Sequence, residues 1–379
     1  MKITFLTPAD NLTGGTRVIA TYARLLQQRG HAVQVVSNAP DVPSLRQRWQ
    51  ALRRGEGWPQ VRHVPAPAGH IAQSGVPHRV LERLRPITAN DVPDADIVIA
   101  TWWETAVWMH TLPAAKGRRV HLIQGHEVWT GGDVRQRVHA ALRLPNRKIA
   151  ISSALAREIE AELGDVRLSV VPNAVDLGLF DAPVRRRGEP PTVGFIYART
   201  PIKGSDLCAR ACELARRRIP GLRVLAFGVD TPCADWPLPA GAEFVHLPAQ
   251  HRIPGLYAQC DAWLFGSRLD SFGLPILEAM ACRTPVVGVP IGAAPDLLSA
   301  GGGVLLSEAT PEAMADALVQ VCSGPAEHWD RLSAQAHERA HRYSWDDATN
   351  RLLGLLQDDG ANTPPSMTTS TRPLAEEIA

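Results

Sequence analysis

The stretch at residues 265–290, FGSRLDSFGLPILEAMACRTPVVGVP, restricts the possible fold more than any other part of the chain. Its pattern predicts a strand that ends near Gly266, a loop of small and polar residues, and a helix with Pro275 in its first turn. Proline suits that turn because the N–H it lacks would have no partner there. The β-branched run at residues 286–289 is typical of the next strand in a parallel sheet. The stretch therefore predicts an α/β fold.

The start of the predicted helix also indicates an anion site. Backbone N–H groups in the preceding turn lie at the positive end of a helix dipole, which suits phosphate oxygens. Two carboxylates flank this turn, Asp270 on the loop and Glu278 in the helix, and each can accept hydrogen bonds from sugar hydroxyls. The backbone donors are expected from Ser271, Phe272, Gly273 and Leu274.

The same residues resemble the donor-site signature of retaining glycosyltransferases of family four. That signature has an acid, seven residues and a glutamate, with Phe-Gly-Leu-Pro between them; here Glu278 is the second acid and residues 272–275 match. The first acid, usually Glu, is Asp270, and the following Gly is Ser271. The resemblance implies the GT-B fold, in which two Rossmann-like domains face across a cleft and a C-terminal helix crosses back to the first domain. The alternative is an ordinary strand-loop-helix unit with Glu278 as a surface acid.

Length and composition agree with two domains in a chain of 379 residues with 45% hydrophobic residues. No apolar run reaches the length of a membrane-spanning helix, and MKITFLT begins a strand rather than a signal peptide, so we expect a cytoplasmic protein. The six cysteines include no Cys-x-x-Cys pair, and we expect them to be buried apolar residues. Through residue 180, 22 Lys and Arg face 15 Asp and Glu, so the first half is basic.

The first half opens with a predicted βαβ unit: a strand at residues 2–6, a loop at Gly14 and Gly15, a helix at residues 16–29 and a strand at residues 31–37. Glycines there let backbone N–H groups approach a phosphate. The three-glycine dinucleotide fingerprint is missing, so no nicotinamide cofactor is indicated. The resemblance places Gly14 and Gly15 near the donor diphosphate or the acceptor; the alternative is a tight turn.

Predicted strands at residues 96–100 and 119–124 follow, and His126 and Glu127 come directly after the second one. A histidine and an acid at a strand's carboxyl end suit a polar site at that edge of a sheet. The resemblance implies that His126 contacts the donor sugar. The alternative is a loop histidine without a role.

The second half begins after a linker at residues 181–191, which is rich in Pro and Arg. A strand at residues 192–197 leads to Arg199 and Lys203, which resemble the pair of cations that grips the donor diphosphate in the family. Arginine offers a planar fork and lysine a mobile point charge, so both can neutralise a leaving phosphate without a metal. The alternative is two surface cations. The predicted domains are residues 1–180 and 192–343, followed by a crossover helix at 344–357 and a disordered tail at 358–379.

Two basic amphipathic helices are predicted in residues 42–86, one at 45–54 and one at 78–85. Helices of this kind lie on anionic membranes with their arginines among the headgroups. We expect weak, salt-sensitive binding to anionic lipid vesicles. A solvated basic face is the alternative.

The combined prediction is a retaining, metal-independent glycosyltransferase without a cofactor. It moves a hexosyl unit from a nucleotide diphosphate sugar to a glycan or lipid-linked acceptor, in polysaccharide or glycolipid biosynthesis at the inner face of the plasma membrane, and it binds no nucleic acid. Three alternatives stay open: a catalytically silent sugar-nucleotide-binding subunit, a sugar-nucleotide epimerase of the same fold, and a metal-dependent transferase of the other major fold. In the last, Asp94 and Asp96 would hold the metal.

Overall fold

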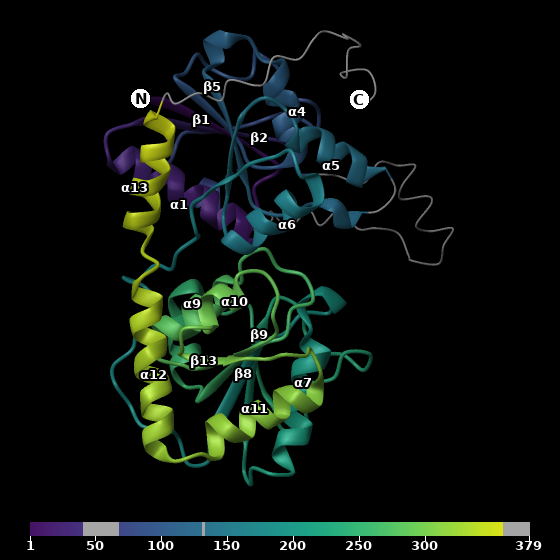
Figure 1. The fold of residues 1–379 in the computed structure, drawn as a ribbon, viewed down its shortest axis with the longest axis vertical. Helices are drawn as coiled ribbons and strands as arrows, with labels where there is room; N and C mark the ends of the chain where they lie inside the picture. The colour runs from purple at the N-terminus through teal and green to yellow at the C-terminus, as the bar shows by residue number, and fades with distance from the viewer. Residues whose placement is uncertain (41–67, 131–132, 359–379) are drawn as a thin grey trace. The chain divides into compact units, whose positions relative to one another are not determined.

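The computed structural model describes residues 1–40, 68–130 and 133–358 (Figure 1). By its internal contacts the chain forms two compact units. The first comprises Met1–Ala150, Ile159–Ser169 and the chain from Thr349 onward, and the second comprises Ile151–Glu158 and Val170–Ala348.

The first unit is built on a seven-stranded sheet with the order β3-β2-β1-β4-β5-β6-β7. Neighbouring strands from β3 to β6 pair in parallel. The strands are β1 (Lys2–Thr7), β2 (Ala32–Ser37), β3 (His78–Val80), β4 (Ile97–Ala100), β5 (Arg118–Ile123), β6 (Arg147–Ala150) and β7 (Ser169–Val170). The helices in this part of the chain are α1 (Gly14–Gln28), α3 (His70–Gln73), α4 (Trp103–Thr111) and α5 (Val134–Leu142). Helix α6 (Ser153–Leu163) begins in the second unit and belongs to the first from Ile159 onward.

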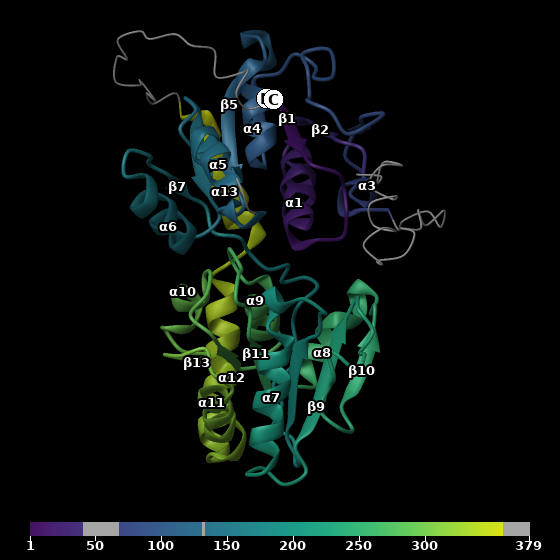
Figure 2. The ribbon, with the colours of Figure 1, turned by 90° about the vertical axis from the view of Figure 1, so that its right-hand side faces the viewer.

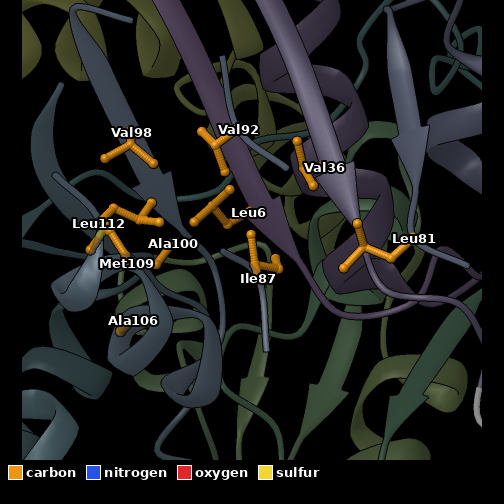
Figure 3. Packing of buried hydrophobic residues seen from close by; sticks show 10 residues of the cluster. All are labelled: Leu6, Val36, Leu81, Ile87, Val92, Val98, Ala100, Ala106, Met109 and Leu112. Atoms are coloured by element: carbon orange, nitrogen blue, oxygen red, sulfur yellow. The ribbon is translucent and has the colours of Figure 1, made fainter. Parts of the chain in front are cut away.

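The strands of this sheet carry apolar side chains on both faces, and burying both faces removes these side chains from water. Figure 3 shows a cluster of ten buried apolar residues, in which residues of β1, β2 and β4 meet residues of α4, Leu112 directly after it, and residues of the segment between β3 and β4. Helix α1 buries Val18, Tyr22 and Leu26 along one face, in agreement with the helix predicted at residues 16–29.

The second unit is built on a six-stranded sheet with the order β10-β9-β8-β11-β12-β13, in which all neighbours are parallel. Its strands are β8 (Thr192–Ile196), β9 (Arg223–Gly228), β10 (Glu243–His246), β11 (Ala262–Phe265), β12 (Val286–Gly288) and β13 (Gly303–Leu305). Both sheets thus repeat the strand order 3-2-1-4-5-6 of doubly wound nucleotide-binding folds. In such sheets the order reverses between the first and fourth strands, here β8 and β11, and ligands bind at the carboxyl ends of the strands at that point.

The helices of the second unit pack along this sheet (Figure 2). Helix α7 lies beside α11, and α12 lies beside α9. Tyr257, Phe227 and Trp263 form an aromatic cluster in the core, with Tyr257 and Trp263 ring centroids 4.5 Å apart. The helices are α7 (Ser205–Arg216), α8 (Ile253–Ala258), α9 (Leu274–Ala281), α10 (Ala294–Leu298), α11 (Pro311–Ser323) and α12 (Ala326–His341).

The last helix, α13 (Trp345–Gln357), returns the chain to the first unit from Thr349 onward. Arg118 donates hydrogen bonds to the carbonyls of Leu356 and Asp358, and Arg147 donates to the Asp358 carbonyl at 3.0 Å. Two cations therefore satisfy the carbonyls at the negative end of this helix. The prediction of a helix that crosses back to the first domain is confirmed.

The helix predicted at residues 78–85 is wrong. Residues 78–80 form strand β3, and Arg79 and Arg85 converge on the buried carboxylate of Asp91, at 3.2 Å and 2.6 Å. A buried charge needs partners, and the Arg85 guanidinium holds the pKa of Asp91 well below its ordinary value. Arg79 and Arg85 therefore pair with an acid of the protein itself, which argues against their binding lipid headgroups. The predicted helix at 45–54 lies outside the described residues.

Within the part of the chain that the structure describes, no helix combines the length and the apolar character needed to cross a membrane. Five of the six cysteines are buried, as expected, and Cys233 is half-buried.

Candidate functional site

Two loops meet at the carboxyl edge of the second sheet, one after β8 and one after β11. Gly204 ends the first loop in the left-handed conformation, with φ of 63°, and a Cβ added to it would lie 1.8 Å from the Gly266 carbonyl oxygen. Only glycine permits such close contact between the two backbones. The residues that follow β8 are thereby held against those that follow β11.

Arg268 strengthens this contact between the loops. Its guanidinium binds both carboxylate oxygens of Asp206, at 2.8 Å and 2.6 Å, and the Pro201 carbonyl at 2.6 Å. Its backbone N–H donates to the Ile202 carbonyl at 2.8 Å. Bidentate pairing of this kind fixes geometry as well as charge. Sequence reasoning missed Arg268, because its partner Asp206 lies 62 residues earlier in the chain.

Lys203 and Asp270, both predicted from the sequence, are brought together by these loops. The Lys203 ammonium lies 3.2 Å from Oδ2 of Asp270, and the lysine side chain is 45% exposed while the aspartate is 17% exposed. The other oxygen of Asp270 accepts a hydrogen bond from the Phe272 N–H at 3.1 Å. A half-exposed cation and a well-held carboxylate therefore face the carboxyl edge together.

The Phe272 N–H was predicted to bind a phosphate, but it donates to Oδ1 of Asp270 instead. A short aspartate side chain readily bonds to the backbone two residues on, and this turn is an example. The Phe272 side chain is buried. Gly273 precedes α9 in the left-handed conformation, with φ of 88°, and Pro275 lies in the first turn as predicted. Leu274 is the first residue of α9, so its backbone N–H has no hydrogen-bond partner within the helix. Ser271 lies in the turn that leads into this helix.

Glu278 lies in the middle of α9 and is 6% exposed. Its Oε2 accepts a hydrogen bond from the Tyr257 hydroxyl at 2.8 Å. A buried carboxylate requires such a partner. Its predicted contact with a ribose is not tested by this geometry and stays a prediction.

Arg199 faces a different carboxylate from Lys203. Its backbone N–H donates to Oδ2 of Asp230 at 2.9 Å, and its guanidinium lies 3.9 Å from Oδ1 of the same residue. Asp230 follows β9, so the loops after three neighbouring strands each bring charge to one edge of the sheet. Both predicted cations lie at this edge, and each is paired with an acid.

Gly14 and Gly15, which were predicted as a loop, begin a helix instead. Helix α1 starts at Gly14, with Thr13 before it, so Gly14 and Gly15 are its first two residues. A Cβ on Gly15 would lie 3.5 Å from the Gln124 side-chain oxygen, an ordinary contact distance. The first N–H groups of this helix still lack helical partners, which keeps the predicted anion contact open.

Asp94 and Asp96, the alternative metal-binding acids, lie just before β4, at the edge of the first sheet formed by the amino ends of its strands. Asp94 pairs with Lys116 at 2.9 Å, and Asp96 accepts the Lys2 N–H at 2.7 Å. Both acids therefore have partners in a structural setting at the amino ends of the strands, away from the edge where parallel sheets bind ligands.

His126 follows β5 and is 4% exposed. Its Nε2 lies 3.2 Å from Nε2 of His139, and its Nδ1 lies 3.7 Å from Oε2 of Glu162. Both ring nitrogens thus lie next to side chains of the same unit. The predicted contact of His126 with a donor sugar stays a prediction.

Glu127, the next residue, is a buried acid at 3% exposure whose Oε2 accepts the Trp103 N–H at 2.9 Å. Burial raises the pKa of Glu127 from its ordinary value of 4.5 to about 8; the Trp103 N–H opposes this rise and the charge of Glu104 adds to it. The carboxyl group is therefore protonated at neutral pH.

Replacing Glu127 by glutamine should change how stability depends on pH. The folded chain keeps a proton that the unfolded chain loses between pH 4.5 and about 8, so the wild-type free energy of unfolding falls as pH rises through this window. Glutamine does not titrate, so Glu127→Gln should match the wild type near pH 5 and exceed its stability near pH 9. Urea unfolding at both pH values measures this; equal differences at the two pH values would contradict it.

Comparisons with known families agree with a ligand site at the carboxyl edge of the second sheet. Residues 12–179 match the model described as Glycosyltransferase Family 4, and residues 190–323 match the model described as Glycosyl transferases group 1. A D-inositol 3-phosphate glycosyltransferase of Stackebrandtia nassauensis is 27% identical over 93% of this chain and 88% of its own length. The match to the enzyme of the same name from Mycobacteroides abscessus is 29% identical and spans 49% of this chain and 45% of that protein.

Solved structures show the same fold. Sucrose-phosphate synthase from Thermosynechococcus elongatus superposes with a TM-score of 0.69 at 16% identity, over 94% of this chain and 98% of that one. Anabaena Alr3699/HepE in complex with UDP-glucose gives a TM-score of 0.69 at 18% identity, over 94% and 99% of the two chains.

Proposed function

We propose that this chain, which belongs to glycosyltransferase family 4, transfers a hexosyl unit from a nucleotide diphosphate sugar to a hydroxyl group with retention of anomeric configuration. Its two Rossmann-like units of the GT-B architecture support this proposal. The observation that carries this proposal is the Lys203 and Asp270 pair at 3.2 Å. It spans the point where the strand order of the second sheet reverses, which is where such sheets bind nucleotides.

The donor is a nucleotide diphosphate sugar, and uridine nucleotides are the first to test. Structures of Alr3699/HepE contain UDP and UDP-glucose, which supports this choice. The family resemblance assigns the ribose diol to Glu278 and a sugar hydroxyl to Asp270. It also assigns His126 to the donor sugar, and Gly14 and Gly15 to the donor diphosphate or the acceptor.

Charge develops on the diphosphate as the bond from the anomeric carbon to the leaving oxygen breaks. Lys203 has three N–H donors and is half-exposed, so it can keep its contact with Asp270 and bind a phosphate oxygen as well. Arg199 and the start of α9 at Leu274 add a second cation and a backbone donor. Stabilisation of this kind is stronger in the transition state than in the ground state, so it accelerates the reaction.

Retention follows when the acceptor hydroxyl attacks from the face that the diphosphate leaves. The acceptor oxygen forms the new bond to the anomeric carbon, and its proton passes to a leaving phosphate oxygen. No protein carboxylate becomes a nucleophile in this scheme, and no metal is required, because Lys203 and Arg199 supply the positive charge.

The acceptor is a glycan or lipid-linked hydroxyl, and the reaction serves polysaccharide or glycolipid synthesis at the cytoplasmic face of a membrane. Curated relatives are named for D-inositol 3-phosphate, so cyclitol phosphates belong in the same acceptor panel.

Thermal-shift screening against UDP, GDP, ADP and their sugars tests the donor site. A nucleotide at 100 times its Kd should stabilise the folded chain by about 2.7 kcal/mol. The bound donor is then incubated with the acceptor panel in EDTA, and the anomeric configuration of the product is read by NMR. Inversion, or loss of transfer in EDTA, would contradict the mechanism, and no shift with any nucleotide would contradict the donor site.

The same experiment separates the alternatives. A catalytically silent subunit would bind a nucleotide without transfer or hydrolysis of the donor. An epimerase would alter the sugar nucleotide in the absence of any acceptor.

A further inference from the structure

Three side chains of the first unit form a cluster that the proposed reaction does not use as a set. His126 follows β5, His139 lies on α5 and Glu162 lies near the end of α6. One potential ligand atom from each lies within 4.8 Å of the others. Two imidazoles and a carboxylate form the donor set of many zinc sites.

Two spacings in the cluster, both measured from Nε2 of His139, fit a tetrahedral ion. Nε2 of His139 lies 3.2 Å from Nε2 of His126 and 3.2 Å from Oε1 of Glu162. Bonds of about 2.0–2.1 Å from a tetrahedral zinc ion place neighbouring ligand atoms about 3.3 Å apart. The two ring centroids are 5.4 Å apart, and two imidazoles on one such ion lie at about 5 Å.

The short contacts can share a single proton. A proton on Nε2 of His139 can be donated both to Oε1 of Glu162 and to the lone pair on Nε2 of His126. If that proton moves to Nδ1 of His139, a metal ion can take its place between the three side chains. The lone pairs then converge on the ion.

We propose that His126, His139 and Glu162 bind a divalent ion of the zinc class, with water in the fourth position. Imidazole ligands favour Zn²⁺, Ni²⁺ and Cu²⁺ over Mg²⁺ and Ca²⁺. The competing cation is Arg135, whose guanidinium lies 3.3 Å from Oε1 of Glu162. Its side chain is 60% exposed, so it can turn into water when an ion binds.

Metal binding does not depend on the proposed transfer reaction. If that reaction is as proposed, the ion and the donor sugar compete for His126, and zinc inhibits transfer.

The second unit holds another cluster of similar composition, which must be removed before zinc binding is measured. Asp181, His337 and His341 lie together, with Nε2 of His337 3.0 Å from Asp181, and this cluster is more exposed than the first. The full chain carrying His337→Ala and His341→Ala is therefore the background for the test.

Calorimetric titration of this background protein with ZnCl₂ should show one ion per chain, and zinc should raise its melting temperature. Adding His139→Ala or Glu162→Gln should weaken zinc binding at least tenfold and remove the thermal shift. His110→Ala on α4 is the matched control and should leave zinc binding unchanged. MgCl₂ should produce no shift in any variant.

Circular dichroism without zinc shows whether each variant is folded. Glu162→Gln preserves side-chain size, so it tests the site even if His139→Ala unfolds. Equal zinc affinity in the background protein and in folded Glu162→Gln would overturn the proposal, as would absence of binding in the background protein. Nucleotide-induced thermal shifts, measured in parallel, report separately on the donor site.

Discussion

Replacing Lys203 by alanine is expected to lower the turnover number for sugar transfer by about 10²- to 10³-fold, the cost of removing one group that stabilises developing charge. Lys203 lies 3.2 Å from Asp270 at the edge where the diphosphate is proposed to leave. Its side chain is 45% exposed, so little packing is lost and the folded state should survive. Steady-state kinetics with a saturating donor measures the effect.

Lys116→Ala is the matched control. It also removes a lysine from a Lys and Asp pair, here with Asp94 at 2.9 Å, but before β4 in the first unit. It should retain full turnover. Lys203→Ala with turnover within twofold of the wild type, in folded protein, would remove Lys203 from the mechanism.

Replacing Gly204 by alanine is expected to lower the free energy of unfolding by more than about 2 kcal/mol and to abolish nucleotide binding. The left-handed conformation alone costs a non-glycine residue about 1–2 kcal/mol. The added Cβ would lie 1.8 Å from the Gly266 carbonyl oxygen, so the two loops must also separate. Their separation moves Lys203 away from Asp270. Urea unfolding and nucleotide thermal shifts measure the two effects.

Gly255→Ala, in helix α8 of the same unit, is its matched control. No atom lies within 4 Å of a Cβ built there, and alanine favours a helix by about 1 kcal/mol over glycine. It should be neutral or stabilising. Similar stability of the two variants would show that the loops tolerate separation and that their contact does not constrain the site.

The strands could be predicted from the sequence because most are short, apolar and separated by turn residues. Residues 192–197 were predicted as a strand and residues 192–196 form β8, and residues 16–29 were predicted as a helix and α1 covers residues 14–28. Lys203 and Asp270 were assigned to one site by family resemblance, and the structure places them in contact.

What the sequence could not reveal depends on long-range contacts. Arg268 binds Asp206, 62 residues earlier, and no local pattern indicates that pair. The predicted helix at residues 78–85 was wrong because Asp91, several residues later, captures Arg79 and Arg85. The Phe272 N–H was expected to bind phosphate, but the adjacent side chain of Asp270 competes for it.

Because helix α13 returns the chain to the first unit, the larger segment of the second unit is an insertion within the sequence of the first. Residues 170–348 form one continuous block, whereas the first unit needs the chain on both sides of that block. A recombinant enzyme with a new donor preference should therefore be made by exchanging this block at both ends. A single crossover near residue 180 would pair Arg118 and Arg147 with a foreign C-terminal helix, and the graft would lose the ion pair between Arg147 and the Asp358 side chain at 3.4 Å unless the foreign helix ends in an acid.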